Sequence, residues 1–330
     1  MMNTHKPGFV TSINYMENKK FASRVSFLVK RPPPGKFSDG VRILWRVLCL
    51  APKGERMLLS SSWGTWHPEL MAAAIMGLLP KSKRPSIYLL GCMWEPDRGV
   101  RGVLERMIIK LADRAIDRYI VQSTEEMAIF PPMWRVSPGK LRYCPFFYSI
   151  RERDLPSNQE TRPEEYIFAG GNSMRDYEPM VEAARSLPQH KFIIATNLLH
   201  GRDDLPSNFE AKPVSHNQFV SLLYSSSATV VPVKSGLHRA AGQQTYLNAM
   251  WLGKPTIVTD TLGVHDHIRH KETGLIVDGS PESYIEALNW VYDPNNKGAV
   301  ARLNAAAKRE VEEKFSFERH IERLLEIMDE

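Results

Sequence analysis

Residues 228–278 read ATVVPVKSGLHRAAGQQTYLNAMWLGKPTIVTDTLGVHDHIRHKETGLIVD. Three short runs rich in β-branched residues are expected to be buried strands, at residues 229–233, 256–259 and 274–277. The apolar stretch 243–252 is expected to be a helix that ends at Gly253. A strand, a helix and a strand in this order form a unit of a parallel sheet, and such sheets bind ligands at the carboxyl ends of their strands.

Strands and helices alternate along the remainder of the chain, which predicts an α/β fold with doubly wound parallel sheets. In the second half we expect strands at residues 166–169 and 191–195, and helices at 178–187, 217–224, 281–291 and 299–328. In the first half we expect strands at residues 25–29, 57–60, 87–90 and 119–122, and helices at 40–50, 68–79 and 100–118. The first 60 residues show no opening of strand, glycine-rich loop and helix. Either the first domain is reduced there or its opening loop is rebuilt.

The segments LNAMWLGKPTIVTDTLG and ETGLIVDGSPESYIEAL resemble the donor-binding half of retaining GT-B glycosyltransferases of the family-4 type. The family pattern has two glutamates, separated by seven residues, before the sequence G-K-P. With Gly253 as the anchor, these glutamates fall on Ala240 and Asn248, so both are replaced here. The resemblance covers residues 100–330. It implies a GT-B fold with two Rossmann-like domains, an interdomain cleft and a nucleotide-sugar donor.

The resemblance also implies a domain organisation. We expect residues 1–150 to form an acceptor-side Rossmann-like domain and residues 166–315 to form the donor domain. Residues 151–165 are polar, contain proline and lack periodicity, as expected of a linker. By the resemblance, residues 316–330 form a helix that packs back on the first domain.

The composition indicates a globular protein of the cytosol. Apolar residues make up 43% of the chain and charged residues 24%, and no apolar run reaches the roughly 18–20 residues that span a bilayer. The amino terminus lacks the apolar centre of a signal peptide. Cys49, Cys92 and Cys144 are isolated in sequence, so we expect a reducing compartment with neither a disulfide framework nor a zinc site.

Charge is unevenly distributed. Residues 1–150 hold 23 Lys and Arg against 11 Asp and Glu, a balance of +12, whereas the full chain carries +6. Such a basic half suggests an anionic partner, such as a membrane surface or a lipid pyrophosphate, and we expect no nucleic acid; solubility is the alternative. Within it, the expected helix 100–118 has an apolar face and a basic stripe. We favour a core-facing helix over one that lies on a membrane. The stripe consists of Arg106, Lys110, Arg114 and Arg118.

The first candidate site follows the strand at 166–169. Gly170 and Gly171 would let a phosphate approach the backbone, and Arg175 would bind it. The family has a G-R-x-x-x-x-K-G loop here that holds the donor diphosphate. Because Gly171 replaces the family arginine, Arg175 would be the main remaining cation. Alternatively, Arg175 pairs with a carboxylate such as Asp176 or Glu178.

The second candidate site precedes the helix at 243–252. Gly242 lies just before this helix, whose free N–H groups form an anion site supplemented by nearby basic residues. By the resemblance, Asn248 stands at the ribose-binding position. Alternatively, Gln243 and Gln244 carry the sugar contacts, or Asn248 only caps backbone groups. The expected donor contacts are Gly170, Gly171, Arg175, Lys234, Arg239, Gly242, Gln243, Gln244, Thr245 and Asn248.

The third candidate site lies in the first half, where the family has a polar residue beside the anomeric carbon. His67 and Glu95 each follow a strand, and Glu95 is favoured because its neighbour Trp94 suits sugar stacking. Asp97 is the second choice. A helix cap or a loop hydrogen bond is the alternative role for each. The expected catalytic residues are Glu95, Arg175 and Lys234.

Three histidines, His265, His267 and His270, are spaced like metal ligands. The resemblance argues against a metal site, because GT-B enzymes hold the diphosphate with helix ends and basic residues. We therefore expect no metal and no cofactor, with the nucleotide sugar as substrate.

The favoured hypothesis is a glycosyltransferase that moves a sugar, with retention, to a glycan or polyprenyl-linked acceptor in polysaccharide or exopolysaccharide biosynthesis. It would work in the cytoplasm, peripherally on the inner membrane face. The alternatives are an inactive GT-B scaffold that partners an active transferase, because both glutamates are lost, and a nucleotide-sugar 2-epimerase.

Overall fold

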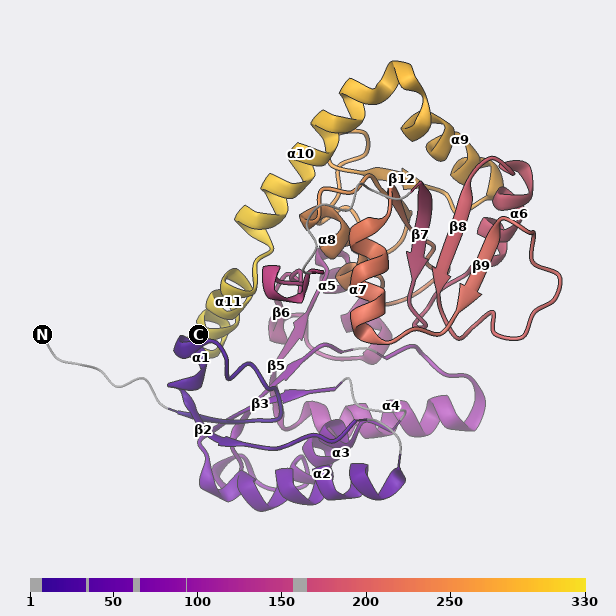
Figure 1. The fold of residues 1–330 in the computed structure, drawn as a ribbon. Coiled ribbons are helices and arrows are strands. Elements are labelled where there is room, and N and C mark those ends of the chain that lie inside the picture. The colour runs from indigo at the N-terminus through magenta and orange to yellow at the C-terminus, as the bar shows by residue number, and fades with distance from the viewer. Residues whose placement is uncertain (1–7, 34–35, 62–65, 93, 157–164) are drawn as a thin grey trace, which may run out of the picture. The chain divides into compact units, whose positions relative to one another are not determined.

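The computed structural model describes residues 8–33, 36–61, 66–92, 94–156 and 165–330. The chain forms two compact units, each built on one sheet (Figure 1). The N-terminal unit contains Met1–Pro145 and His320–Glu330, and the C-terminal unit contains Phe146–Arg319. Much of the proposed linker, residues 157–164, lies outside the described residues.

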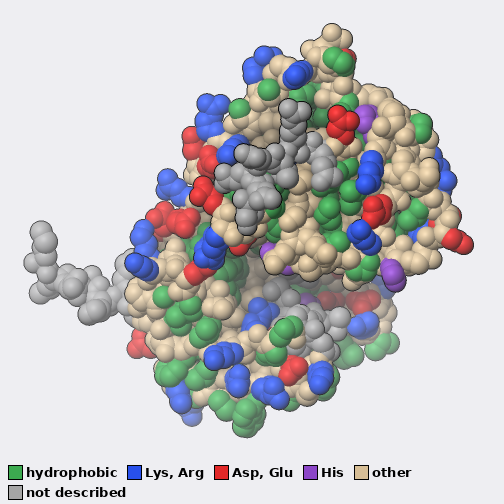
Figure 2. Space-filling model, in the orientation of Figure 1, with side chains coloured by type: hydrophobic (Ala, Val, Ile, Leu, Met, Phe, Trp, Pro, Cys, Tyr) green, Lys and Arg blue, Asp and Glu red, His purple; other side chains and the backbone are tan. Residues whose placement is uncertain are grey.

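The sheet of the N-terminal unit is parallel and has the order β2-β1-β3-β4-β5-β6. Its strands are β1 (Phe9–Thr11), β2 (Val25–Leu28), β3 (Arg56–Ser60), β4 (Ser86–Leu90), β5 (Ile116–Val121) and β6 (Leu141–Tyr143). The helices are α1 (Lys19–Ala22), α2 (Phe37–Leu50), α3 (Pro68–Met76), α4 (Gly99–Asp113), α5 (Thr124–Trp134) and α11 (Phe317–Asp329). Figure 2 shows hydrophobic and basic side chains gathered over the region of α2.

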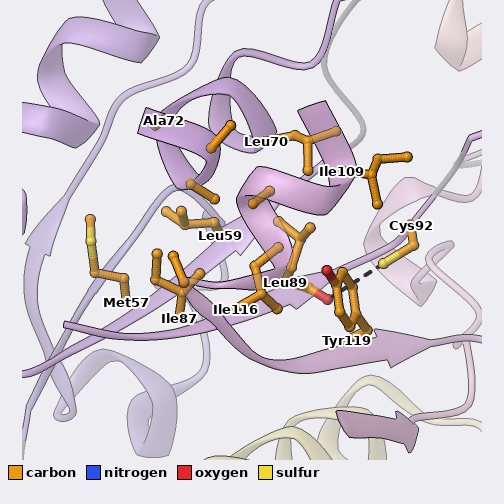
Figure 3. Close-up of a cluster of buried hydrophobic side chains, with 14 of the residues drawn as sticks. Met57, Leu59, Leu70, Ala72, Ile87, Leu89, Cys92, Ile109, Ile116 and Tyr119 are labelled. Carbon is orange, nitrogen blue, oxygen red and sulfur yellow. Dashed lines mark hydrogen bonds between the residues drawn. The ribbon is translucent and has the colours of Figure 1, made fainter. Parts of the chain in front are cut away.

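The core of the N-terminal unit lies between the central strands and α3. Met57, Leu59, Ile87 and Leu89 from β3 and β4 are fully buried against Leu70 of α3 (Figure 3). These side chains alternate along their strands, as expected where one face of the sheet is covered by helices. The packing fixes the ends of β3 and β4 and, with them, the loops that follow.

The sheet of the C-terminal unit is also parallel and has the order β12-β11-β10-β7-β8-β9. Its strands are β7 (Tyr166–Gly170), β8 (Lys191–Ala195), β9 (Phe209–Lys212), β10 (Ala228–Val231), β11 (Thr256–Thr259) and β12 (Leu275–Val277). The helices are α6 (Glu178–Ser186), α7 (His216–Ser225), α8 (Gln243–Trp251), α9 (Pro281–Tyr292) and α10 (Lys297–Lys314). Read in chain order, this is the 3-2-1-4-5-6 arrangement of dinucleotide-binding folds, and it confirms the predicted doubly wound sheets.

Three strands were not predicted: β1, β6 and β9. Each is three or four residues long, so a hydrophobic pattern has little room to appear. The N-terminal unit therefore has a six-stranded sheet in which β1 lies between β2 and β3.

The prediction for residues 100–118 was wrong in two respects. The helix α4 ends at Asp113, and Arg118 lies in β5, so the four basic residues do not form one helical stripe. The β5 strand begins early because Ile116 is buried beside β4, and the Asp117 carboxylate accepts the Ile87 N–H at 3.1 Å. The second error concerns the apolar side of the helix, which faces the core only in part: Ile108 and Leu111 pack on the core of the N-terminal unit, whereas Val100 and Met107 are 78% and 56% exposed.

The chain divides at Pro145 and Phe146, earlier than the boundary expected after residue 150. Tyr148 stacks on Trp251 of α8 with ring centroids 5.2 Å apart, which assigns this segment to the C-terminal unit. The expected helix 299–328 is two helices, α10 and α11, with a break after Lys314. Residues 320–330 belong to the N-terminal unit, where Asp329 pairs with Arg24 at 2.8 Å.

No helix among the described residues is both long enough and apolar enough to cross a membrane.

Candidate functional site

The strand order of the C-terminal unit reverses between β7 and β10, and the first two candidate segments follow these strands. Segment 174–176 lies alongside segment 232–234. Arg175 and Val233 form an antiparallel bridge, and the Lys234 N–H donates to the Met174 carbonyl at 3.0 Å. Ligands of doubly wound sheets bind at such a switch point, so the topology brings the two candidate segments into one site.

Arg175 lies at the centre of this site. Its side chain is buried, with 6% exposed, although most arginines are on the surface. The guanidinium donates to the Gly170 carbonyl at 3.3 Å, to the Ser173 carbonyl at 2.9 Å and to the Thr245 hydroxyl at 3.1 Å. The bond to Thr245 joins the loop after β7 to the first turn of α8.

The positive charge of Arg175 has no carboxylate partner among the described residues, so the alternative of an ion pair with a neighbouring acid is wrong. Asp176 accepts the Glu178 N–H, and Glu178 pairs with Arg202. Burial lowers the pKa of Arg175, yet a guanidinium stays protonated in proteins. A buried charge with only neutral partners is costly unless an anion comes close to it.

The amino terminus of α8 adds to this positive potential. Gly242 occupies the N-cap with φ +83°, and no side chain caps the helix. A Cβ atom built on Gly242 would lie 3.7 Å from Nη1 of Arg175, so the cation is beside the positive end of the helix dipole. The positive end of a helix dipole and a buried cation together attract phosphate.

Gly170, the last residue of β7, and Gly171, which follows it, have packing roles in addition to the predicted contact with phosphate. A Cβ atom built on Gly170 would lie 2.4 Å from the Phe219 ring, and one built on Gly171 would lie 3.1 Å from Nη2 of Arg175. Gly171 has φ +114°, which L side chains rarely adopt. The absent side chains therefore make room for the Phe219 ring and for the Arg175 guanidinium, and the approach of a phosphate to this backbone stays a prediction.

Polar side chains for which the sequence predicts no such role hold the loop after β7. The Tyr177 hydroxyl donates to the Gly171 carbonyl at 2.7 Å, and the Thr196 hydroxyl donates to the same carbonyl at 3.1 Å. The Asn172 side chain accepts the Asn197 N–H at 2.7 Å. Their spacing in sequence gives no hint of these contacts, because they join the ends of two neighbouring strands.

Asn248 has the structural role named as one alternative. It is buried, and its Oδ1 atom accepts the N–H groups of Ser149 at 2.7 Å and Ile150 at 3.1 Å. The exposed Gln244 donates to the Ser149 hydroxyl at 2.8 Å. Both side chains therefore fix the segment that precedes the described part of the linker.

The other expected donor contacts have different degrees of exposure. Lys234 is exposed, on the loop that pairs with the Arg175 segment. Arg239 and Gln243 are each only 6% exposed, and Nη1 of Arg239 donates to the Ala240 carbonyl at 3.5 Å. Lys234 is thus the cation of this region that reaches solvent.

The third candidate site is a cavity of about 530 Å³ in the N-terminal unit, to which His67, Glu95 and Asp97 all contribute. His67 precedes α3 with φ +47°, and the other two follow β4. Glu105 was missed; its carboxylate accepts the Asp97 N–H at 3.2 Å, and burial raises its pKa. The apolar part of the wall consists of Phe37, Trp66, Leu70, Met71, Trp94, Leu104 and Ile108.

Trp94 is not available for sugar stacking, so that reason for favouring Glu95 was wrong. Its side chain is 2% exposed and belongs to the core of the N-terminal unit. It packs edge-to-face on Tyr119 and Trp134, with ring centroids 6.4 and 5.8 Å away. Glu95 itself remains at the cavity wall.

The three histidines have separate protein partners. His265 lies 3.0 Å from the Asp260 carboxylate, and Nδ1 of His270 accepts the Ile276 N–H. His267 is buried, which lowers its pKa, and its Nδ1 lies 3.0 Å from the Tyr246 hydroxyl. Among the described residues, no group of three His, Cys, Asp or Glu side chains is arranged to hold a metal ion.

The comparisons with known proteins agree with this architecture. The sequence profile described as glycosyl transferases group 1 matches residues 182–293, within the C-terminal unit. No curated protein matches the chain by sequence.

Three solved structures illustrate the shared fold. HepE of Anabaena, crystallised with UDP, is 12% identical at a TM-score of 0.71, over 98% of this chain and 99% of that chain. Sucrose-phosphate synthase of Thermosynechococcus elongatus is 14% identical at a TM-score of 0.66, and the match covers 89% of this chain and 78% of that chain. TarM of S. aureus is 15% identical at a TM-score of 0.62, and the match covers 88% of this chain and 58% of that chain. Two parallel six-stranded sheets with helices, and this likeness over nearly its full length, give the chain the GT-B fold of glycosyltransferases.

Proposed function

We propose that this protein is a glycosyltransferase whose nucleotide-sugar donor binds at the amino terminus of α8. The observation that carries the proposal is the buried guanidinium of Arg175, which has only neutral partners and lies beside that terminus. A diphosphate would supply the missing negative charge. The glycosyl transferases group 1 match and the UDP-bound HepE and TarM structures support a nucleotide sugar over other anions.

Electrostatic stabilisation is the proposed source of catalysis in the C-terminal unit. When the bond between the anomeric carbon and the diphosphate breaks, negative charge grows on the departing phosphate. The α8 terminus and the buried Arg175 would stabilise this charge, and so would the exposed Lys234. The acceptor oxygen forms the new bond, and its proton leaves with the diphosphate. We propose that no metal ion is needed and that the anomeric configuration is retained.

The cavity of the N-terminal unit is the proposed acceptor site. Its acidic side chains, Glu95, Asp97 and Glu105, can accept hydrogen bonds from sugar hydroxyls, and Glu95 would stabilise the positive charge that develops at the anomeric carbon. The apolar wall fits a lipid-linked glycan better than a fully polar one. We propose such an acceptor, with a role in polysaccharide assembly.

A second candidate function is an inactive GT-B scaffold. It is favoured by Asn248, which stands at the ribose-binding position but uses its Oδ1 atom to hold Ser149 and Ile150. Ribose recognition by this residue would require those bonds to break, so a donor must be held by other groups.

Turnover distinguishes the two candidates. The purified chain is incubated with UDP-, GDP- and ADP-sugars, and released nucleoside diphosphate is measured beside thermal stabilisation by each diphosphate. A transferase releases one of the nucleoside diphosphates. Release is slow when water is the acceptor of the sugar and faster when a lipid-linked acceptor is added. Stabilisation without any release would favour the scaffold, and no stabilisation by any diphosphate would contradict the donor site.

A further inference from the structure

Three neighbouring helices of the N-terminal unit expose large apolar side chains. The helix α3 packs against both α2 and α4. On α2, Phe37, Val41 and Trp45 are four residues apart, and their exposed fractions are 71%, 43% and 68%. They form one stripe, opposite the buried Ile43 and Val47. A helix that faced only water on this side would carry polar residues there.

The other two helices continue the pattern. Ile75, at 40% exposed, is followed by Leu78 and Leu79 just after α3, and Val100 and Met107 are exposed on α4. We call the whole set the apolar face: Phe37, Val41, Trp45, Ile75, Leu78, Leu79, Val100, Val103, Leu104 and Met107. Among the described residues, the C-terminal unit exposes one large apolar side chain, Leu198.

The apolar face is joined to the proposed acceptor cavity. Phe37 of α2, Met71 of α3 and Leu104 of α4 all line that cavity. The Phe37 ring also packs on Trp66, with ring centroids 5.2 Å apart. The three helices therefore contribute to one connected apolar surface, and its size argues for a partner that covers it.

Basic residues border the apolar face. Arg46 lies on α2, Lys81 and Lys83 follow α3, and Arg106 and Lys110 lie on α4; all five are exposed. No ion pair among the described residues is formed by any of the five, whereas the acids Asp39 and Asp97 are paired with Arg42 and Arg101. An apolar centre with a cationic border is complementary to a partner whose interior is apolar and whose surface layer is anionic.

We propose that the apolar face docks this protein on an anionic lipid bilayer. Its apolar side chains would lie among the acyl chains near the headgroups, and the bordering lysines and arginines would contact lipid phosphates. Docking does not depend on sugar transfer. Only its consequence, that a lipid-linked acceptor reaches the cavity along the face, rests on the proposed function.

Co-sedimentation with vesicles tests the proposal. The wild-type chain is mixed with vesicles of phosphatidylcholine alone and of phosphatidylcholine with phosphatidylglycerol. We expect binding to the anionic vesicles that weakens as salt is raised. The triple variant Trp45→Ser, Leu79→Ser and Val100→Ser should bind at least about tenfold more weakly, because three exposed apolar side chains are lost. None of the three residues lines the acceptor cavity.

Matched controls come from the C-terminal unit. Leu198→Ser removes an exposed apolar side chain outside the face, and Lys308→Glu reverses an exposed charge on α10; both should bind like wild type. Charge reversal at Lys83 should weaken binding to the anionic vesicles. The proposal is overturned if wild type stays in the supernatant, if the triple variant sediments equally, or if wild type is a lipid-independent dimer that the triple variant abolishes. Nucleoside diphosphate binding by the triple variant should be unchanged, which separates this test from that of the proposed function.

Discussion

The two units are built on similar six-stranded parallel sheets, yet they differ in where they place cations and exposed apolar side chains. The C-terminal unit buries a cation, Arg175, under a helix terminus and exposes one large apolar side chain among its described residues. The N-terminal unit instead exposes an apolar face bordered by cations. A buried cation is suited to a small anion that enters a fixed site, whereas a broad apolar face is suited to an extended apolar partner. Similar folds are therefore suited to the proposed donor site in one unit and to the proposed acceptor surface in the other.

The largest expected effect concerns the acceptor cavity. Glu95→Gln keeps the size of the side chain and one acceptor oxygen but removes its charge. We expect the rate of sugar transfer to fall by about 100-fold, as for the loss of one electrostatic stabiliser. Nucleoside diphosphate affinity should stay unchanged, because Glu95 belongs to the N-terminal unit. Steady-state kinetics and calorimetry measure the two; a transfer rate within threefold of wild type would remove Glu95 from catalysis.

The next effect concerns the buried cation. Arg175→Ala should weaken nucleoside diphosphate binding by about 1.5–3 kcal/mol, the range for a charge-assisted hydrogen bond. The control Thr245→Val removes only the hydroxyl that Arg175 contacts at 3.1 Å. It should cost less, because the charge remains. Calorimetric titration gives both affinities, and an equal loss in the two variants would mean that Arg175 only positions the helix.

A pH effect is expected in the N-terminal unit. His320 is buried, and burial lowers its pKa to about 4, while its Nδ1 atom lies 2.8 Å from the Pro145 carbonyl. The unfolded chain binds this proton near pH 6.5, so the folded state loses stability as the pH falls from about 6.5 to 4. Urea unfolding at pH 7 and pH 4.5 gives the loss in the free energy of unfolding between the two pH values. This loss should be roughly 2 kcal/mol smaller in His320→Gln than in wild type. A loss of equal size in both chains would exclude His320 as the cause.

The smallest effect concerns Asn248. Asn248→Ala should lower the free energy of unfolding by roughly 1–2 kcal/mol, because the Ser149 and Ile150 N–H groups lose a buried acceptor. Asn248→Asp keeps that acceptor and should cost less. Urea unfolding measures both variants. Nucleotide affinity should change little in either; a larger change in affinity than in stability would restore a ribose-binding role.

The fold could be predicted where elements are long or strongly β-branched, as in β10, α8 and β11. The strands β1, β6 and β9 could not, because three or four residues carry too little pattern. The apolar side of α4 was predicted correctly only in part, for a different reason. An amphipathic sequence reports an apolar stripe, but it does not tell whether that stripe meets a core or remains at the surface.

The candidate site was predicted in part. The pattern of strand, glycines and Arg175 located a cation, but its burial and its bond to Thr245 arise only when segments 70 residues apart meet. The phosphate contact of the glycines stays a prediction, and the sequence did not indicate that Gly170 also accommodates the Phe219 ring. Asn248 shows the limit most clearly, because its two backbone contacts are about 100 residues away in sequence.

Arg175 and the α8 terminus are proposed to form an anion site for the donor diphosphate. The most direct measurement is a calorimetric titration, in the presence of EDTA, of UDP, GDP and ADP and of the corresponding nucleosides. We predict that one diphosphate binds at least about 100-fold more tightly than its nucleoside, since the phosphates contact a buried cation and a helix terminus. Equal affinity of diphosphate and nucleoside, or no binding by any diphosphate, would contradict the claim.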